Sequence, residues 1–248
     1  MFCPFCGSQN TPDASLCSNC GYSFSANQGA PVSPVSPDWE EHGHILNIVS
    51  FFITVRDVLF SPTLTFRHLK RDNAVFNAFL FGLIGATIGG AANTLWQFLV
   101  SIMGFAPEGG ALSRWFGTTS TFIVTLFMVP LMSALSILLM SVVLHFILKL
   151  LGGADRGFPA TFKVFAYAQG ATALLGVVPF CGSVAGFFWL LVICIIGLKE
   201  AHETTHGKSM AAVLLPLALC CVCAAFAVFL LVLSGISLAR FNHFFPWQ

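Results

Sequence analysis

The chain has 248 residues, of which 56% are hydrophobic and only 8% are charged. Soluble domains carry about 25% charged residues, so the composition excludes an ordinary soluble protein and predicts an integral membrane protein. The formal net charge of +1 says nothing about partners, but the positions of the charges along the chain are informative.

The first 24 residues contain two Cys-x-x-Cys pairs, Cys3 with Cys6 and Cys17 with Cys20, separated by ten residues. Each pair is followed by a glycine, which suits a tight turn whose amides face the sulfurs. Four thiolates fit one tetrahedral Zn²⁺, and metal binding would supply the folding free energy of a segment this short. We predict a zinc ribbon over residues 1–24, with one structural Zn²⁺ held by these four cysteines. Disulfides or free thiols are the alternative.

The predicted ribbon has no cationic side chains, and a predicted linker follows it. Residues 1–24 contain no Lys or Arg, so they cannot neutralise phosphates, and we expect no nucleic acid partner. Residues 25–44 are predicted to be a flexible linker, because small polar residues and three prolines between positions 31 and 37 disfavour packing and keep the segment extended.

Residues 45–72 are predicted to form an interfacial amphipathic helix followed by a basic segment. Polar residues recur from Asn47 to Ser61 at spacings of three and four, along one face of an otherwise apolar helix. The stretch includes Arg56 and Asp57, which makes it a poor membrane span, so we place it flat in the interface. The basic cluster that follows suits anionic headgroups and consists of Arg67, His68, Lys70 and Arg71.

Residues 73–239 are predicted to be a membrane domain, because they contain four tracts without Asp, Glu, Lys or Arg, at 73–107, 115–148, 164–198 and 209–239. The third tract is too long for one span of about 20 residues, and Pro179 with Gly182 marks a turn in its middle. We therefore predict a helical hairpin between Lys163 and Lys199. Pro130 in the second tract is interpreted as a kink in a single span, because a turn there would invert the basic loops that follow.

This reading gives five transmembrane helices, and the Lys and Arg residues then orient them. Nine of the eleven fall on one side, which predicts a cytoplasmic N-terminus and an external C-terminus in a cell membrane, most simply a prokaryotic inner membrane. In the reducing cytoplasm the ribbon cysteines would remain thiolates. Residues 240–248 form an aromatic C-terminal tail that suits the outer interface. The nine residues predicted on the cytoplasmic side are Arg56, Arg67, Lys70, Arg71, Lys149, Arg156, Lys163, Lys199 and Lys208. The two predicted on the external side are Arg114 and Arg240.

Two pairs of glycines allow helices to approach closely. They are Gly85 with Gly89 and Gly182 with Gly186. Each pair is compatible with a homo-oligomer face or with a seam inside the domain.

A catalytic pattern also occurs in the sequence. Residues 202–206 match HExxH, the helical zinc-protease pattern, through His202, Glu203 and His206. Thr204, Thr205 and Gly207 make a weak helix, and no Asp or Glu follows that could supply a third ligand. A solvated polar loop is therefore favoured over a metalloprotease.

Polar residues inside the predicted spans are isolated. Gln169 is the deepest of them and is interpreted as an interhelical hydrogen-bonding group. The spans hold no ionised side chain, which argues against an ion-coupled transporter.

Several stretches resemble the Yip family of five-span membrane proteins, named for interaction with Ypt/Rab-type GTPases. They are VLFSPTLTFRHL, FKVFAYAQG, VVPFCGSVAGFFWLLVICIIGLKEAH and AAVLLPL. The resemblance covers roughly residues 39–235 and implies five helices, a cytoplasmic N-terminal region and a role in membrane organisation or trafficking. It implies a GTPase partner only for eukaryotic members.

We therefore predict a non-enzymatic membrane scaffold or adaptor with the zinc ribbon as a cytoplasmic protein-contact module. Its expected partners are the lipid bilayer and other membrane or cytoplasmic proteins. The alternatives are an oligomeric channel or lipid-handling protein and, less favoured, the HExxH metalloprotease.

Overall fold

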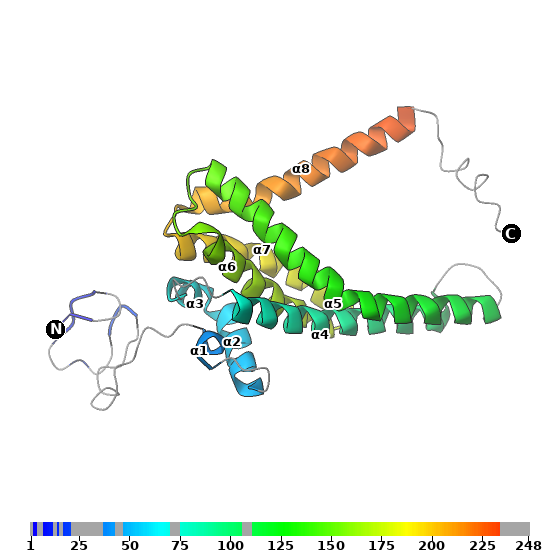
Figure 1. Ribbon diagram of the computed structural model, residues 1–248, viewed down its shortest axis with the longest axis horizontal. Helices are drawn as coiled ribbons and strands as arrows, with labels where there is room; N and C mark the ends of the chain where they lie inside the picture. Colours follow the sequence, from blue (N-terminus) through cyan, green and yellow to red (C-terminus); the bar gives the residue numbers. More distant parts are fainter. Residues whose placement is uncertain are drawn as a thin grey trace.

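The structure is a computed structural model, and it describes residues 2–3, 7–11, 14, 17–20, 37–42, 47–69, 75–105 and 111–233. Within these residues the protein is helical apart from an isolated bridge between Phe2 and Gln9. The elements are α1 (Asp38–His42), α2 (Ile48–Phe60), α3 (Pro62–Arg67), α4 (Phe76–Val100), η2 (Ser101–Phe105), α5 (Ala111–Leu150), α6 (Gly157–Ala173), η3 (Leu174–Val177), α7 (Cys181–His202) and α8 (His206–Leu233) (Figure 1).

Four helical segments are long and apolar enough to cross a membrane: Phe76–Met103, Gly117–Leu150, Cys181–His202 and His206–Leu230. They confirm the prediction of an all-α integral membrane protein. The predicted third span corresponds to α6, whose 17 residues reach only about 26 Å at 1.5 Å per residue. Because α6 falls short of a typical span by itself, the count of five remains a prediction.

Helix α6 forms the centre of the bundle. Helices α2, α4, α5 and α7 all pack against it, and from Thr161 to Thr172 every residue except Gln169 is buried. A helix that is surrounded on all sides must be apolar or internally paired all round, which explains the run of alanines and aromatics in α6. The rings of Phe81 on α4 and Tyr167 on α6 lie 5.1 Å apart, centroid to centroid.

The predicted hairpin is confirmed, with a break at the expected place. Helix α6 continues through η3, the chain turns at residues 178–180, and α7 returns from Cys181 to pack against α6. Phe180 adopts a left-handed φ of 63°, which a phenylalanine rarely does. The second tract is likewise a single helix, α5, which is visibly bent (Figure 1). Pro130 lies inside α5 and accounts for the bend.

Both glycine pairs lie at internal seams, which is the second of the two arrangements that the sequence allowed. A Cβ on Gly85 would lie 2.2 Å from the Gly170 carbonyl oxygen, and one on Gly89 would lie 1.9 Å from that of Ala173. These contacts join α4 to α6. Gly182 and Gly186 similarly bring α7 against the backbone of residues 172–175. The four glycines are buried and are not available to a second copy of the chain.

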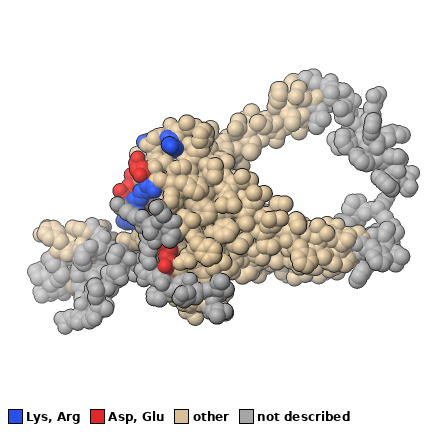
Figure 2. Space-filling view, viewed as in Figure 1, with Lys and Arg blue, Asp and Glu red and all other residues tan. Residues whose placement is uncertain are grey.

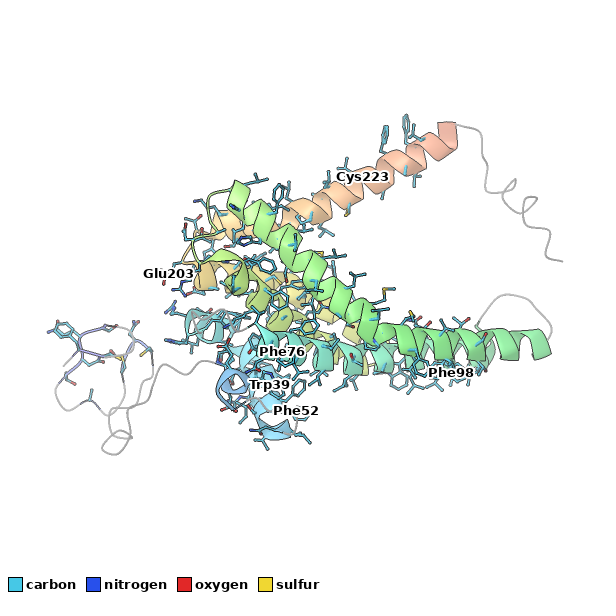
Figure 3. The ribbon with its side chains drawn as sticks, viewed as in Figure 1. Trp39, Phe52, Phe76, Phe98, Glu203 and Cys223 are labelled. Carbon is cyan, nitrogen blue, oxygen red and sulfur yellow. The ribbon has the colours of Figure 1, made fainter. Side chains whose placement is uncertain are left out.

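The outer helices expose apolar faces. In the candidate spans of α5 and α8 only 6% of the most apolar 18-residue window is buried. Helix α8 diverges from α5 along its length (Figure 1), and Cys223 lies on the diverging part of α8 (Figure 3) and is exposed. Lipid is the medium in which such faces are stable.

A helix, α2, forms where the interfacial helix was predicted, and its polar stripe packs against the protein. Ser50 and Thr54 are buried at 1% and 0% exposure, whereas Phe52 points outward (Figure 3). The exposed residues of this helix include Ile48, Val49, Phe52 and Phe60. The stripe packs on the protein and the apolar residues face out, which suits an interface helix.

The predicted linker over residues 25–44 ends earlier than expected. Residues 38–42 form α1, and Trp39 is 1% exposed. Its indole Nε1–H donates to the carbonyl oxygen of Asn77 at 2.8 Å, and its backbone N–H donates to Thr54 Oγ1 at 3.0 Å. These bonds are the reason why Thr54 points inward, and they fix α1 to the start of α4.

Charged side chains gather at one end of the bundle, and the apolar helices extend away from it (Figure 2). This end contains α3, the end of α5, the start of α6 and the α7–α8 turn (Figure 1).

Candidate functional site

The cysteines of the N-terminal segment come together as a candidate metal centre. The sulfurs of Cys3, Cys17 and Cys20 all lie within 4.8 Å of one another, and Sγ of Cys3 lies 3.7 Å from Sγ of Cys20. Zn–S bonds of 2.3 Å in a tetrahedron place two sulfurs about 3.8 Å apart, so this spacing fits a thiolate-bound metal. Cys6 is outside the described residues, and its predicted role as the fourth ligand is therefore untested.

Local hydrogen bonds position these cysteines. Gly7 has a left-handed φ of 73°, which lets the chain reverse just after the first pair. Its N–H donates to the Cys3 carbonyl at 2.9 Å, and the Cys3 N–H donates to the Ser8 carbonyl at 2.8 Å. The reversal brings Cys3 back toward the second knuckle.

Asn10 joins the two knuckles. Its side-chain Nδ2–H donates to Cys17 Sγ at 3.4 Å, and its Oδ1 accepts from the Ser18 N–H at 2.9 Å. Burial alone would raise the pKa of the Cys17 thiol, but hydrogen bonds from the backbone of Asn19 and Cys20 and from Asn10 lower that pKa overall. The geometry thus favours the thiolate that a metal requires. Sequence patterns identified the cysteines but missed Asn10.

At the charged end of the membrane domain, an ion-pair network joins α3 to α7. Glu200 accepts from Arg67 Nε at 3.0 Å and from Lys199 Nζ at 2.7 Å. Phe66 is fully buried beside Gly197. Burial lowers the pKa of His68, and the neighbouring charge of Arg67 lowers it further. Arg67 of the predicted basic cluster therefore forms a structural contact within the protein.

The HExxH residues do not form a zinc-binding helix. Helix α7 ends at His202, Glu203 has a left-handed φ of 54°, and α8 begins at His206. The carboxylate of Glu203 forms an ion pair with Arg156, and His206 is exposed. The three side chains therefore do not converge on one point.

His202 is instead part of a buried hydrogen-bond chain. Its Nδ1 accepts from the Arg156 N–H at 3.3 Å, and its Nε2 lies 2.9 Å from Thr161 Oγ1. The same hydroxyl lies 3.0 Å from His145 Nδ1. The Arg156 amide requires the other ring nitrogen of His202 to carry the proton, so Nε2 donates to Thr161 and Thr161 donates to His145. This chain ties α5, α6 and α7 together.

A buried ion pair anchors α1 to the central helix. Nζ of Lys163 lies 2.9 Å from Oε1 of Glu40, and the two side chains are 1% and 4% exposed. Trp39 packs beside it, with its ring 5.8 Å from Phe51 and 6.0 Å from Phe81, centroid to centroid. Lys163 was expected to mark the start of a span, but α6 begins at Gly157 and Lys163 lies inside the protein.

The apolar half of the bundle contains a cavity of about 520 Å³ between α4, α5, α6, α7 and α8. Its lining is largely apolar, no Asp, Glu, Lys or Arg of the described residues takes part, and its polar members are Asn93, Ser133, Ser136, Gln169, Thr172 and Ser183. In the sequence, these polar residues are interpreted as isolated from one another. The packing of five helices brings them together, and Gln169 lines a cavity as well as bonding between helices.

A model of the Yip1 domain matches residues 56–239, and a model of the zinc-ribbon domain matches residues 2–24. No curated protein and no solved structure matches the chain. The first match covers the bundle from the middle of α2 to the end of α8, and the second covers the cysteine cluster.

Proposed function

Because the chain belongs to the Yip1 domain family, we propose that it is a non-enzymatic membrane scaffold or adaptor, acting in membrane organisation or trafficking. Its N-terminal zinc ribbon is the module that contacts cytoplasmic or membrane proteins. The observation that carries the proposal is the anchoring of α1. Trp39 and Glu40 hold the chain firmly just before the bundle, so the ribbon is a separate unit tethered to a fixed point.

The ribbon holds one structural Zn²⁺ through Cys3, Cys6, Cys17 and Cys20. Three of these sulfurs already lie within metal-binding distance of one another. When bound, the ion stabilises the fold of a segment that has almost no core, and the four thiolates complete its coordination without an open position for catalysis.

The protein crosses the membrane five times, with the ribbon in the cytoplasm and the C-terminus outside. The support for this topology is the gathering of charged residues at one end of the bundle (Figure 2). Lys and Arg mark the cytoplasmic side of membrane proteins. With α6 counted as a span, the charged ends of α4, α5, α6, α7 and α8 all lie on that side.

The contact surface of the ribbon has no Lys or Arg and includes an aromatic side chain. Phe2 is 71% exposed, and residues 1–24 contain no Lys or Arg. An exposed aromatic ring contributes strongly to protein interfaces when a partner covers it. The partner is therefore a protein with an apolar recess, and Phe2 supplies the anchor.

The test places a photocrosslinking amino acid at the exposed position Gln9 in full-length protein, and identifies the captured partners by mass spectrometry. The expected partners are captured by the parent protein and by Cys223→Ser, and they are lost in Cys17→Ser and in Phe2→Ala. Cys223→Ser is the matched control, because Cys223 is exposed on α8. Phe2→Ala should keep its zinc. Capture of the same partners by Cys17→Ser would overturn the proposal.

Lipid handling is the second candidate function, and the cavity in the apolar half of the bundle favours it. Its test is lipid scrambling in proteoliposomes of purified protein. Scrambling at the rate of protein-free vesicles would remove this candidate and leave the adaptor role unaffected.

A further inference from the structure

The polar residues of the cavity are spread along the apolar half of the bundle, with Gln169 and Ser136 at one level. Gln169 is twelve residues beyond the start of α6, Ser136 is fourteen residues before the end of α5, and Asn93 is seventeen residues beyond the start of α4. At 1.5 Å per residue, these positions lie about 18, 21 and 26 Å from the charged end. A hydrocarbon core is about 30 Å thick, so this polar level lies within the apolar zone.

Gln169 at this level, and Asn93 further along the cavity, are carboxamides with hydrogen-bonding capacity left over. Oε1 of Gln169 accepts from Ser136 Oγ at 3.5 Å, and Oδ1 of Asn93 accepts from Ser183 Oγ at 3.3 Å. Each carboxamide also has two N–H donors, and these meet no acceptor within the described part of the chain. A donor without an acceptor is costly in hydrocarbon. A ligand that brings oxygen acceptors to this level would remove the cost.

The remaining lining fits a hydrocarbon chain. The buried floor of the cavity includes Leu144, Phe165, Cys194 and Val213. Its volume of about 520 Å³ is within the range of ligand pockets. The absence of a cationic side chain among the described lining residues makes a phosphate group an unsuitable occupant of the cavity itself.

The cavity is accessible from the side of the bundle. Met140 on α5, Phe187 on α7 and Leu217 on α8 belong to its lining and are 36%, 45% and 38% exposed. These residues form a rim on the faces that contact lipid, so a chain can enter directly from the bilayer.

We propose that this cavity binds a lipid acyl chain and that the carboxamide of Gln169 donates a hydrogen bond to its ester carbonyl. The proposal deepens the lipid-handling candidate by naming its binding site, but binding does not require that lipid be moved. Uncharged diacylglycerols can bring an ester carbonyl to this depth, whereas the ester carbonyls of a phospholipid are held beside its phosphate at the membrane surface.

The experiment uses full-length protein in nanodiscs of ether-linked phosphatidylcholine, which supplies no ester carbonyl. The probe is a diacylglycerol with a photoactivatable diazirine in one acyl chain, and labelled peptides are mapped by mass spectrometry. Labelling is expected on the lining segments of α5, α6 and α8. Gln169→Leu should reduce it about threefold to tenfold, the effect of one hydrogen bond in a membrane. Gln97→Leu is the matched control, because Gln97 is exposed on α4 and is not part of the lining.

Competition on the unaltered protein provides a second measurement that does not depend on how a variant folds. Unlabelled ester-linked diacylglycerol should displace the probe, and its ether-linked analogue should not. Ester phosphatidylcholine should not displace the probe, because its carbonyls lie beside a phosphate that the cavity does not suit. Displacement by phosphatidylcholine would place the site near the membrane surface and would overturn the proposal. Equal displacement by the ether analogue, or equal labelling of Gln169→Leu, would overturn the proposal. Labelling without scrambling would retain the site and remove only the lipid-moving function.

Discussion

Replacing Lys163 with methionine should detach α1 from the membrane domain. The ammonium of Lys163 lies 2.9 Å from Oε1 of Glu40, and both side chains are almost completely buried. Methionine keeps much of the apolar stem but removes the charge that offsets the buried carboxylate. The buried carboxylate is then unpaired, which is strongly unfavourable. It can be hydrated only if α1 leaves its position.

The expected magnitude follows from this burial. Removing one partner of a buried ion pair costs about 3–5 kcal/mol. At about 1.4 kcal/mol for each factor of ten, this raises the detached population by between about 10² and 10⁴-fold. The double variant Glu40→Gln with Lys163→Met removes both charges, and such replacements are often close to neutral. The detached population of α1 in the double variant should therefore remain within about tenfold of that in the parent protein.

Hydrogen exchange of the α1 amides, followed by mass spectrometry, measures this opening directly. Exchange should accelerate by about 10²-fold or more in Lys163→Met and should largely recover in the double variant. Lys208→Met is the control, because Lys208 is a cation at the same end of the bundle and its Nζ donates only to the Gly152 carbonyl among the bonds described. Unchanged exchange in Lys163→Met would refute the idea that this ion pair holds α1.

Three further predictions concern the ribbon, a helix seam and the buried histidine. Cys17→Ser should reduce the zinc content measured by metal analysis from one per chain to none, while the protein still inserts in the membrane; retention of zinc would exclude Cys17 as a ligand. Gly85→Ala should destabilise the protein in detergent by about 1–3 kcal/mol through overpacking, since the new Cβ would lie 2.2 Å from the Gly170 oxygen. Gly117→Ala, whose Cβ would meet nothing within 4 Å, should be neutral or stabilise by up to about 1 kcal/mol, and equal thermal shifts for the two would contradict the seam. Thr161→Val should cost about 1–3 kcal/mol, because it leaves ring nitrogens of two histidines without their hydroxyl partner, whereas Glu203→Gln, at an exposed ion pair, should cost less than about 1 kcal/mol.

The features that the sequence predicted correctly depend on local chemistry. Pro179 and Gly182 interrupt the third apolar tract whatever surrounds them, and the hairpin turns there. Pro130 bends α5 without ending it, as expected for a proline within a membrane helix. Three of the four predicted ligands, Cys3, Cys17 and Cys20, have their sulfurs together, and Cys6 lies outside the described residues. The two proline signals lie within the residues whose structure they determine.

The features that the sequence could not predict depend on which helices meet. The periodicity of α2 reveals a polar stripe, but only the docking of Trp39 turns Thr54 inward. Helix α1 has five residues, too few to show a period, and its burial is decided by Lys163 on a distant helix.

The HExxH pattern shows the same limit for a catalytic motif. The spacing is right, but Glu203 takes a left-handed conformation that ends α7, and His202 pairs with Thr161. The cavity is similar, because Ser136 and Gln169 come within hydrogen-bonding distance only when α5 packs against α6.

The orientation of the ribbon relative to the membrane is the central claim, and reporter fusions at Gln28 and at Gln248 test it most directly. One reporter must be active only in the cytoplasm and the other only outside it. We expect the fusion at Gln28 to report the cytoplasm and the fusion at Gln248 to report the external side, as five crossings require. Both fusions reporting the same compartment would contradict the five-span topology and, with it, the proposed adaptor.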